Sequence, residues 1–436
     1  MTFFELFCGI FYESFIVVSF LKNNKMVFGI PFQCDTCGTV IRLKIQADNS
    51  LYSYGYPVSV KCPKCGNVLE FRYAREKGIL PIDYWVAEDT KTEYDFYYSA
   101  FLPIGIGLEM RPSDHIGLTP FMELGKSYFP ENIASHNFRG NLFLTNIYPY
   151  RTVFKDVLPI YRKGNVAAYS KKIAKIFNLG KKFTPIADIK NCRKHLLELL
   201  RSTYKNIATD KYVECIVTPF LLETLDVANM DELKAPYAMA TNIVNYSQWQ
   251  NSSFDFIANM VAKFEKYIPS LFYCAVGDFK ERHDPPMNVY TISLDEAITD
   301  YDISFNLIKE LLPLLVSLSN YRLTGKANVF PNGDKGMKGI GTVKEFYELP
   351  DGLKMDKLQD YPEIVDFLAG GFNTKIRNGI GHRRWSLVND TQKVQFYYRQ
   401  NDLAEHYDVQ LIDLCYLTIV NLLHIMEFVL LIEKLK

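Results

Sequence analysis

An arginine, an asparagine and a histidine stand close together in one short stretch, I-R-N-G-I-G-H, which runs from Ile376 to His382. Histidine exchanges a proton near neutral pH, and arginine holds phosphate oxygens through two parallel hydrogen bonds. On a helix, at about 100° per residue, Asn378 and His382 lie on the same face. The opposite face is an apolar stripe formed by Phe372, Ile376 and Ile380. This pattern predicts an exposed histidine that takes part in phosphate chemistry.

Arg377 lies about 140° round the same helix from His382. The two side chains therefore converge on one phosphate only through a long side-chain reach, or across a two-fold axis from a second copy of the chain. Gly379 and Gly381 each disfavour a helix by about 1 kcal/mol relative to Ala, so we expect something to approach the backbone closely here. Either a second helix or an RNA strand could make this close approach.

The segments around this motif give it a structural context. The histidine is followed directly by Arg383, Arg384 and Trp385. A short strand is predicted by the alternation of Val394, Phe396 and Tyr398. A long apolar helix is expected from about 409 to 435. An earlier helical pattern, 294–323, is expected to be the first long helix of the C-terminal domain, kinked at Pro313.

An R-N-x-x-x-H motif on a helix, followed by a small hairpin and a closing helix, resembles the HEPN superfamily over residues 294–436. Active members of that family are metal-independent ribonucleases that act as homodimers. Arg377, Asn378 and His382 all match the motif, whereas family members more often carry Ala or another small residue at positions 379 and 381. The resemblance implies RNA cleavage to a 2′,3′-cyclic phosphate and a 5′-OH, and a role in bacterial anti-phage defence or as a toxin.

In such an endoribonuclease, His382 would serve as general acid or base, and Arg377 would hold the phosphate as charge builds on it. Asn378, one turn from His382, would orient the imidazole or the phosphate. Contacts with the RNA backbone and with a stacked base are expected from Arg383, Arg384 and Trp385. The alternative is a non-catalytic HEPN-like dimer that binds nucleic acid, a nucleotide or a protein partner, because one fold hosts both active and silent members.

Two C-x-x-C pairs near the start, each followed by Gly, have the spacing C-x2-C-x24-C-x2-C and consist of Cys34, Cys37, Cys62 and Cys65. Four thiolates at this spacing close a tetrahedral zinc site, and the glycines allow the tight turns around the sulfurs. With strands predicted beside both pairs, residues 26–75 are expected to form a zinc ribbon. Four thiolates leave no open coordination position, so the expected zinc is structural and supplies folding energy.

A basic tract, 151–205, carries 14 Lys and Arg against three acids, which are Asp156, Asp188 and Glu198. A helix predicted at 166–178 presents, on one face, Lys171, Lys172 and Lys175. A second helix is predicted at about 188–207. The tract is interpreted either as a phosphate-binding surface for RNA or as a solvated face. In the second case its charge is compensated downstream by Asp210, Glu214, Glu223, Asp226, Asp231 and Glu232.

A glycine-rich stretch between the C-terminal helices, 331–342, lacks the G-K-[ST] ending of a phosphate-binding P-loop. It is therefore predicted to be a mobile loop. Functional residues often lie on such loops, and Lys335 and Lys338 would let this one close over an RNA substrate.

The composition is that of a globular chain: 436 residues, 48% hydrophobic and 14% aromatic, with a formal net charge of zero. This length allows two or three domains, and the zero net charge excludes a global field that draws the protein to nucleic acid. The nine cysteines do not form a disulfide framework, which indicates a cytoplasmic protein. Glu5 and Glu13 interrupt the hydrophobic leader or extension, 1–25, and disfavour a transmembrane helix there.

Together these signals predict an α+β multidomain chain that is mainly α. A small β zinc ribbon is followed by a mixed, mostly helical middle region, 76–290, and by a HEPN-like helical bundle, 294–436. RNA is the expected partner and the HEPN-like domain the expected homodimer contact. The sequence specifies neither the RNA target nor a regulatory partner.

Overall fold

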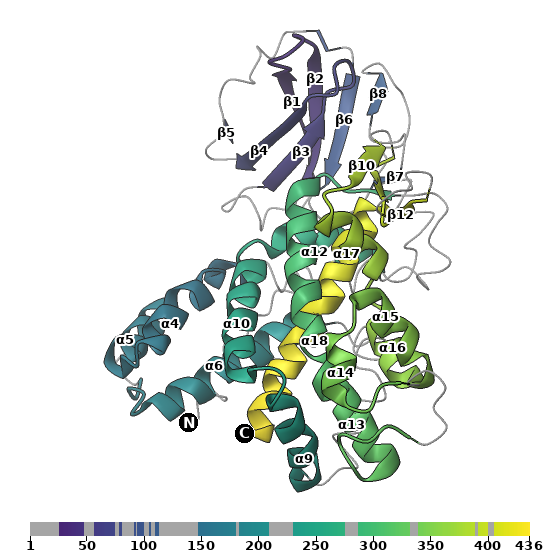
Figure 1. Ribbon diagram of the computed structural model, residues 1–436. Helices are drawn as coiled ribbons and strands as arrows, with labels where there is room; N and C mark the ends of the chain where they lie inside the picture. Colours follow the sequence, from purple (N-terminus) through teal and green to yellow (C-terminus); the bar gives the residue numbers. More distant parts are fainter. Residues whose placement is uncertain are drawn as a thin grey trace, which may run out of the picture.

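The computed structural model of the chain describes residues 26–47, 56–74, 78–80, 91–92, 94–99, 104–105, 110–112, 147–179, 183–208, 230–274, 287–331, 339–388, 391–399 and 405–436. The predicted leader, 1–25, and the loop lysines Lys335 and Lys338 lie outside these residues. A helical body carries a module of small sheets at one end (Figure 1). The predicted α+β, mainly α class is therefore confirmed.

The sheet module contains two hairpins that bear the cysteine pairs. The first sheet has the strand order β1-β2-β6-β8, with β1 Met26–Gln33, β2 Val40–Ala47, β6 Tyr94–Ser99 and β8 Met110–Pro112. The second has the order β3-β4-β5, with β3 Tyr56–Lys61, β4 Val68–Ala74 and β5 Gly78–Leu80. Strand β2 pairs antiparallel with β1 and parallel with β6. The sheet that holds the first cysteine pair thus continues past residue 75.

The basic tract folds into a lobe of three helices beside the body (Figure 1). They are α4 Val153–Arg162, α5 Val166–Ile176 and α6 Ile189–Ile207, preceded by the 3-10 turn η4 Tyr148–Tyr150. The side chain of Asn165 caps α5 by accepting from Ala168 N, and Asp188 caps α6 by accepting from Asn191 N. Both predicted helices are confirmed.

The middle of the body is built from α9 Met230–Thr241, α10 Tyr246–Ala262, η5 Phe264–Tyr267 and α11 Ile268–Cys274. A short strand, β9 Met287–Asn288, then pairs with β7 Ile104–Gly105. Just beyond it, Ser59 N of β3 donates to Tyr290 O at 2.6 Å. The segment after β9 therefore joins the sheet module to the helical body.

The prediction of one continuous helix over 294–323 is wrong. The chain forms two helices, α12 Leu294–Lys309 and α13 Leu312–Thr324, and Pro313 lies in the first turn of α13. The missing N–H of proline has no cost in a first turn, so Pro313 starts a helix here and does not kink one. The chain continues through α14 Val343–Glu348, α15 Asp351–Lys357, η6 Leu358–Asp360, α16 Pro362–Ala369 and α17 Thr374–Gly381.

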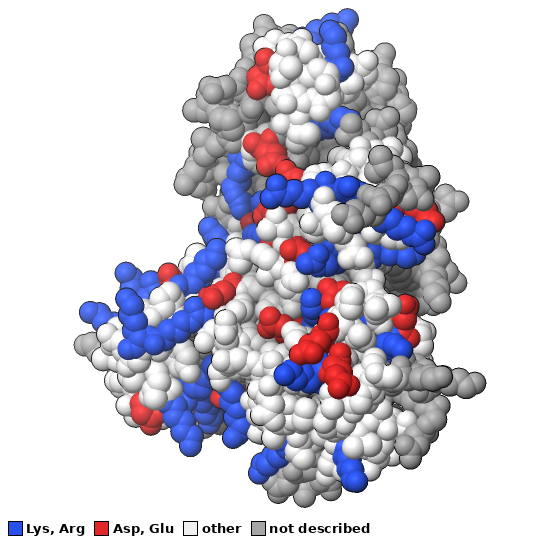
Figure 2. Space-filling model, viewed as in Figure 1, with Lys and Arg blue, Asp and Glu red and all other residues white. Residues whose placement is uncertain are grey.

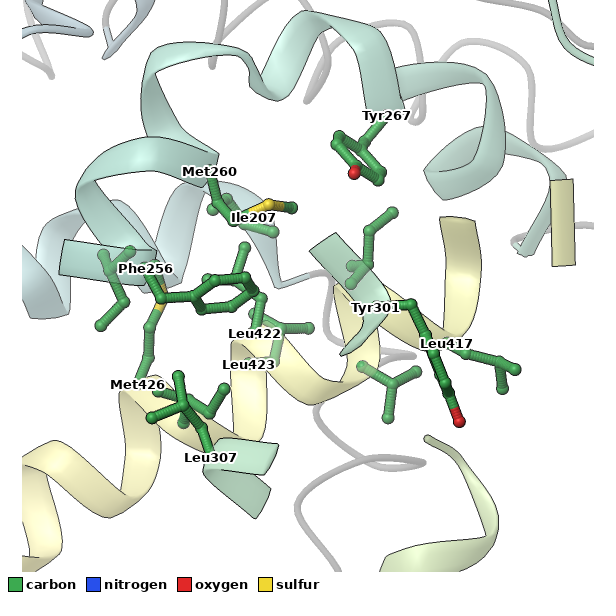
Figure 3. Close-up of a cluster of buried hydrophobic side chains, with 14 of the residues drawn as sticks. Ile207, Phe256, Met260, Tyr267, Tyr301, Leu307, Leu417, Leu422, Leu423 and Met426 are labelled. Atoms are coloured by element: carbon green, nitrogen blue, oxygen red, sulfur yellow. The ribbon is translucent and has the colours of Figure 1, made fainter. Parts of the chain in front are cut away.

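The C-terminal sheet and helix follow the expected order. The antiparallel sheet is β10 Trp385–Val388, β11 Lys393–Phe396 and β12 Tyr407–Gln410, and α18 spans Leu411–Leu435. Within the described residues α18 alone is long and apolar enough to cross a membrane, but 83% of its apolar window is buried. Its Leu417, Leu422, Leu423 and Met426 lie in a cluster with side chains such as Phe256 and Tyr301 (Figure 3). This burial is that of a core helix.

Candidate active site and metal centre

The predicted motif occupies α17, which begins after Asn373. The side chain of Asn373 accepts from the backbone N–H groups of Lys375 and Ile376 and so caps the helix. Ile376 and Phe372 are buried, as the apolar stripe predicts. His382 is the first residue after the helix and is exposed. The prediction that this histidine lies outside the core is confirmed.

The chain turns sharply after His382 and enters β10. His382 N donates to Asn378 O at 3.0 Å, and Arg384 N donates to Gly379 O at 2.8 Å. Arg383 takes a left-handed conformation, with φ of 53°, which lets these bonds form. The turn satisfies the last carbonyls of α17 and leaves the imidazole of His382 at the surface.

Arg377 folds its guanidinium along its own helix, over Gly381. A Cβ built on Gly381 would collide with Nη1 of Arg377, so the guanidinium lies over the residue directly before the histidine. The Nε of Arg377 is buried and has no hydrogen-bond acceptor among the described residues. A donor of this kind is costly to bury unless an acceptor reaches it.

A carboxylate cluster that the sequence did not indicate lies beside Arg377. Asp351 Oδ2 is 4.0 Å from Arg377 Nε, and Asp351 Oδ1 is 2.9 Å from Lys309 Nζ and from Lys354 Nζ. Burial alone would raise the pKa of Asp351, but the hydrogen bonds and charges of the two lysines outweigh it and lower the pKa. Three cations surround one carboxylate, which leaves an excess of positive charge close to the motif.

Within the described residues, the close approach expected at the two glycines is made by the chain itself. A Cβ on Gly379 would lie 2.8 Å from the Cβ of Phe396 in β11. The space over Gly381 is filled by Arg377 itself. The small residues therefore fit the motif helix to the hairpin and to its own arginine.

The other expected RNA contacts sit around the end of α17. Asn378 is half-buried and Arg383 is exposed. Arg384 is half-buried and its Nη1 donates to Arg399 O at 3.5 Å. Trp385, also half-buried, lies in β10 opposite Phe396. These residues are neighbours of His382 in the sequence. They lie where α17 ends and β10 begins.

The four expected metal ligands come together at the tips of the β1–β2 and β3–β4 hairpins. The Sγ atoms of Cys34 and Cys65 are 3.5 Å apart, those of Cys37 and Cys62 are 3.6 Å apart, and all four lie within 4.8 Å of one another. Tetrahedral zinc with sulfurs at about 2.3 Å needs separations of about 3.8 Å. The cluster can therefore hold one metal ion.

The backbone of each hairpin tip is shaped for this cluster. Cys34 N donates to Thr39 O, Cys62 N donates to Asn67 O, and the glycine after each pair has a positive φ, 72° at Gly38 and 76° at Gly66. The side chain and the backbone N–H of Thr39 lower the pKa of the Cys37 thiol to about 6. Burial raises the pKa of the Cys62 thiol, so Cys37 more readily forms the thiolate that binds metal.

The lysines of the basic tract lie apart from α17, in the α4–α6 lobe (Figure 1). Lys171 and Lys175 are exposed on α5. Lys172 is half-buried and its Nζ is 3.2 Å from Asp156 Oδ2. The predicted basic face is thus present on α5, with one of its three charges paired to an acid.

Neither a scan of protein-family models nor searches of curated proteins and of solved structures find a match to this chain.

Proposed function

We propose that the chain is a metal-independent endoribonuclease of the HEPN type that works as a homodimer. The observation that carries the proposal lies at the end of α17, where His382 is exposed and the guanidinium of Arg377 lies over the preceding residue, Gly381. The Nε of Arg377 is buried and lacks a hydrogen-bond acceptor among the described residues. A substrate phosphate would bind the exposed part of the Arg377 side chain, which is 31% accessible to solvent. The excess positive charge around Asp351 favours an anion there.

The reaction needs only groups of this kind. The 2′-OH of RNA is itself the nucleophile, so the protein removes its proton, stabilises the crowded phosphate and protonates the leaving 5′ oxygen. His382 takes one proton-transfer role, and Arg377 binds the phosphoryl oxygens. Arg383 and Arg384 hold the backbone, Asn378 orients the imidazole or phosphate, and Trp385 stacks a base.

The metal of the four-cysteine cluster is proposed to be a structural zinc ion. Four thiolates fill its coordination sphere, so the ion supplies folding energy to the sheet module and takes no part in the cleavage. Cys34, Cys37, Cys62 and Cys65 would hold it.

A second candidate function is a non-catalytic HEPN-like dimer that binds nucleic acid, a nucleotide or a protein partner. It is favoured by the position of Arg377 next to Asp351, at 4.0 Å, because an arginine held by a carboxylate also serves a structural role. In that case Arg377 supports the fold of the motif and His382 has no proton to move.

The deciding experiment incubates the full-length protein with total RNA, with and without EDTA, beside a His382→Ala variant. Cleavage that persists with EDTA and vanishes in the variant supports the ribonuclease. Zinc content is measured after the EDTA step, so that loss of the structural ion is not mistaken for loss of a catalytic one. Intact RNA in every arm, with the protein folded, favours the non-catalytic dimer.

A further inference from the structure

A row of cations on α6 takes no part in the proposed chemistry. It consists of Lys190, Lys194, Arg201 and Lys205, all exposed, which we call the α6 stripe. Their spacing of 4, 7 and 4 residues places them within an arc of about 60° on a helix. At about 1.5 Å per residue the stripe runs for about 22 Å. It is a straight line of positive charge.

The other faces of α6 fix the stripe to the body. Leu196, Leu199 and Leu200 are buried there. Tyr204 Oη donates to Glu427 Oε1 at 2.5 Å, and Arg193 Nη2 is 2.6 Å from Glu433 Oε2. Both acids belong to α18, the core helix, so the four cations project from a rigid support.

Three cations near the stripe are paired with acids, whereas the four stripe residues are not. Arg162 pairs with Asp255 at 2.9 Å, Lys172 with Asp156 at 3.2 Å and Arg193 with Glu433 at 2.6 Å. The stripe residues make no ion pair within the described part of the chain. Asp188 serves as the α6 cap, which leaves Glu198 as the acid on this side of the helix. Lys and Arg gather on this lobe (Figure 2).

We propose that the α6 stripe docks the RNA backbone and contacts phosphates without reading their sequence. This deepens the proposed ribonuclease function and rests on it for the choice of RNA as partner. A row of cations on a rigid helix complements a row of phosphates. A membrane-binding face needs apolar residues among its cations, and the exposed Ile189 lies outside the 60° arc.

The test measures binding of a mixed-sequence single-stranded RNA of about 30 nucleotides at several salt concentrations, in a His382→Ala background that prevents cleavage. A plot of log affinity against log salt has a negative slope. Replacing all four stripe residues with Gln should make this slope shallower by about 0.7 per lost contact. At about 0.1 M salt, affinity should fall on the order of 10²-fold. Gln retains good helix propensity, and thermal unfolding checks each fold.

A matched pair of variants separates a local contact from general charge. Lys194→Gln with Arg201→Gln and Lys91→Gln with Lys326→Gln each remove two exposed cations that make no ion pair within the described residues. Only the Lys194→Gln and Arg201→Gln variant should show a shallower salt dependence of RNA affinity. An unchanged slope in the stripe variants, or equal effects of the two pairs, overturns the proposal. So does loss of binding to phosphatidylserine vesicles with RNA binding intact, which assigns the stripe to a membrane.

Cleavage of a six-nucleotide RNA by protein with an intact His382 tests the proposed function separately. A substrate this short offers few phosphates to the stripe, so its cleavage by the wild-type protein, and the loss of that cleavage in His382→Ala, report on the proposed chemistry. If the stripe variants lose RNA affinity but no RNA is ever cleaved, docking stands and the ribonuclease fails. If RNA is cleaved and the salt slope does not change, the ribonuclease stands and docking fails.

Discussion

Phe396 of β11 packs directly on Gly379 of α17, so closely that a methyl group on the glycine would lie 2.8 Å from the phenylalanine Cβ. The two residues join the motif helix to the C-terminal hairpin. At the far end of β11, the side chain of Gln392 donates to Val289 O and accepts from Val289 N, both at 2.8 Å. The hairpin therefore contacts α17 on one side and the segment beside the sheet module on the other.

Gly379→Ala should destabilise the fold even though Ala favours helices. The added methyl group meets backbone and Cβ atoms of Phe396, which cannot move aside, and overpacking of this kind costs about 1–3 kcal/mol. Gly352→Ala in α15 is the matched control, because nothing lies within 4 Å of its added methyl group. Its stability should equal or exceed wild type. Equal denaturant midpoints for Gly379→Ala and wild type would contradict the close packing.

Asp351→Asn should lower the free energy of unfolding, because Lys354 is 2% exposed and would lose its charge partner. Removing one member of a buried pair costs on the order of 3 kcal/mol. Adding Lys354→Met should recover part of that loss, which a double-mutant cycle measures. The exposed pair of Arg399 and Glu405 is the control, since Glu405→Gln should cost less than about 1 kcal/mol.

The features that depend only on neighbouring residues in the sequence could be predicted. The capped helices α5 and α6, both cysteine turns and the exposed His382 follow from local spacing. The residues that surround Arg377 could not be predicted from local spacing. Asp351 lies 26 positions before Arg377 and 42 after Lys309, and helical periodicity says nothing about which helices meet. No pattern around Asp351 marks it as the partner of three cations.

Long-range packing also determines features that local patterns leave open. Two glycines in a helix indicate a close approach but not its source, which here is Phe396 at one position and Arg377 at the other. Pro313 indicates an interruption, and whether a helix kinks or restarts depends on how the two halves pack. The parallel pairing of β2 with β6 joins segments about 50 residues apart, across a stretch with weak local signals.

Cys62→Ser should release the metal and destabilise the sheet module, because folding and metal binding are coupled in such sites. Elemental analysis should find one zinc ion per wild-type chain. Cys192→Ala is the control: this buried cysteine lies outside the cluster, so its variant should retain the ion. Protein purified without chelator that contains no zinc would rule out the proposed metal.

Acid should destabilise the fold through His195, which is buried and makes a 3.1 Å hydrogen bond with Tyr169. Burial lowers the pKa of His195 from 6.5 to about 4. The unfolded chain therefore binds the proton first, and stability falls as pH drops from about 6.5 to 4, by up to about 1.4 kcal/mol per pH unit.

Unfolding free energies measured across this pH range for wild type and His195→Gln test the claim. The variant should lose this part of the pH dependence. Tyr169→Phe keeps the histidine buried, so its free energy of unfolding should keep the wild-type slope even if its absolute value falls. Identical pH profiles for wild type and His195→Gln would assign the acid sensitivity to other groups.

We propose that two chains of the dimer share each active centre, because positions 377 and 382 lie about 140° apart on an ideal helix. Arg377→Ala and His382→Ala should each be inactive alone. If a centre takes its arginine from one chain and its histidine from the other, a mixed dimer of the two variants regains one intact centre of two. Co-expression with two different affinity tags isolates that mixed dimer for RNA cleavage assays.

The alternative is that one chain supplies both residues, as the guanidinium over Gly381 allows through its long reach along α17. The mixed dimer then contains no intact centre and should be inactive. Sedimentation of the wild-type protein in the same buffer gives its oligomeric state, and an active monomer would exclude the shared centre. A mixed dimer of Arg377→Ala with wild type is the control: it should keep about half of the wild-type activity under either arrangement.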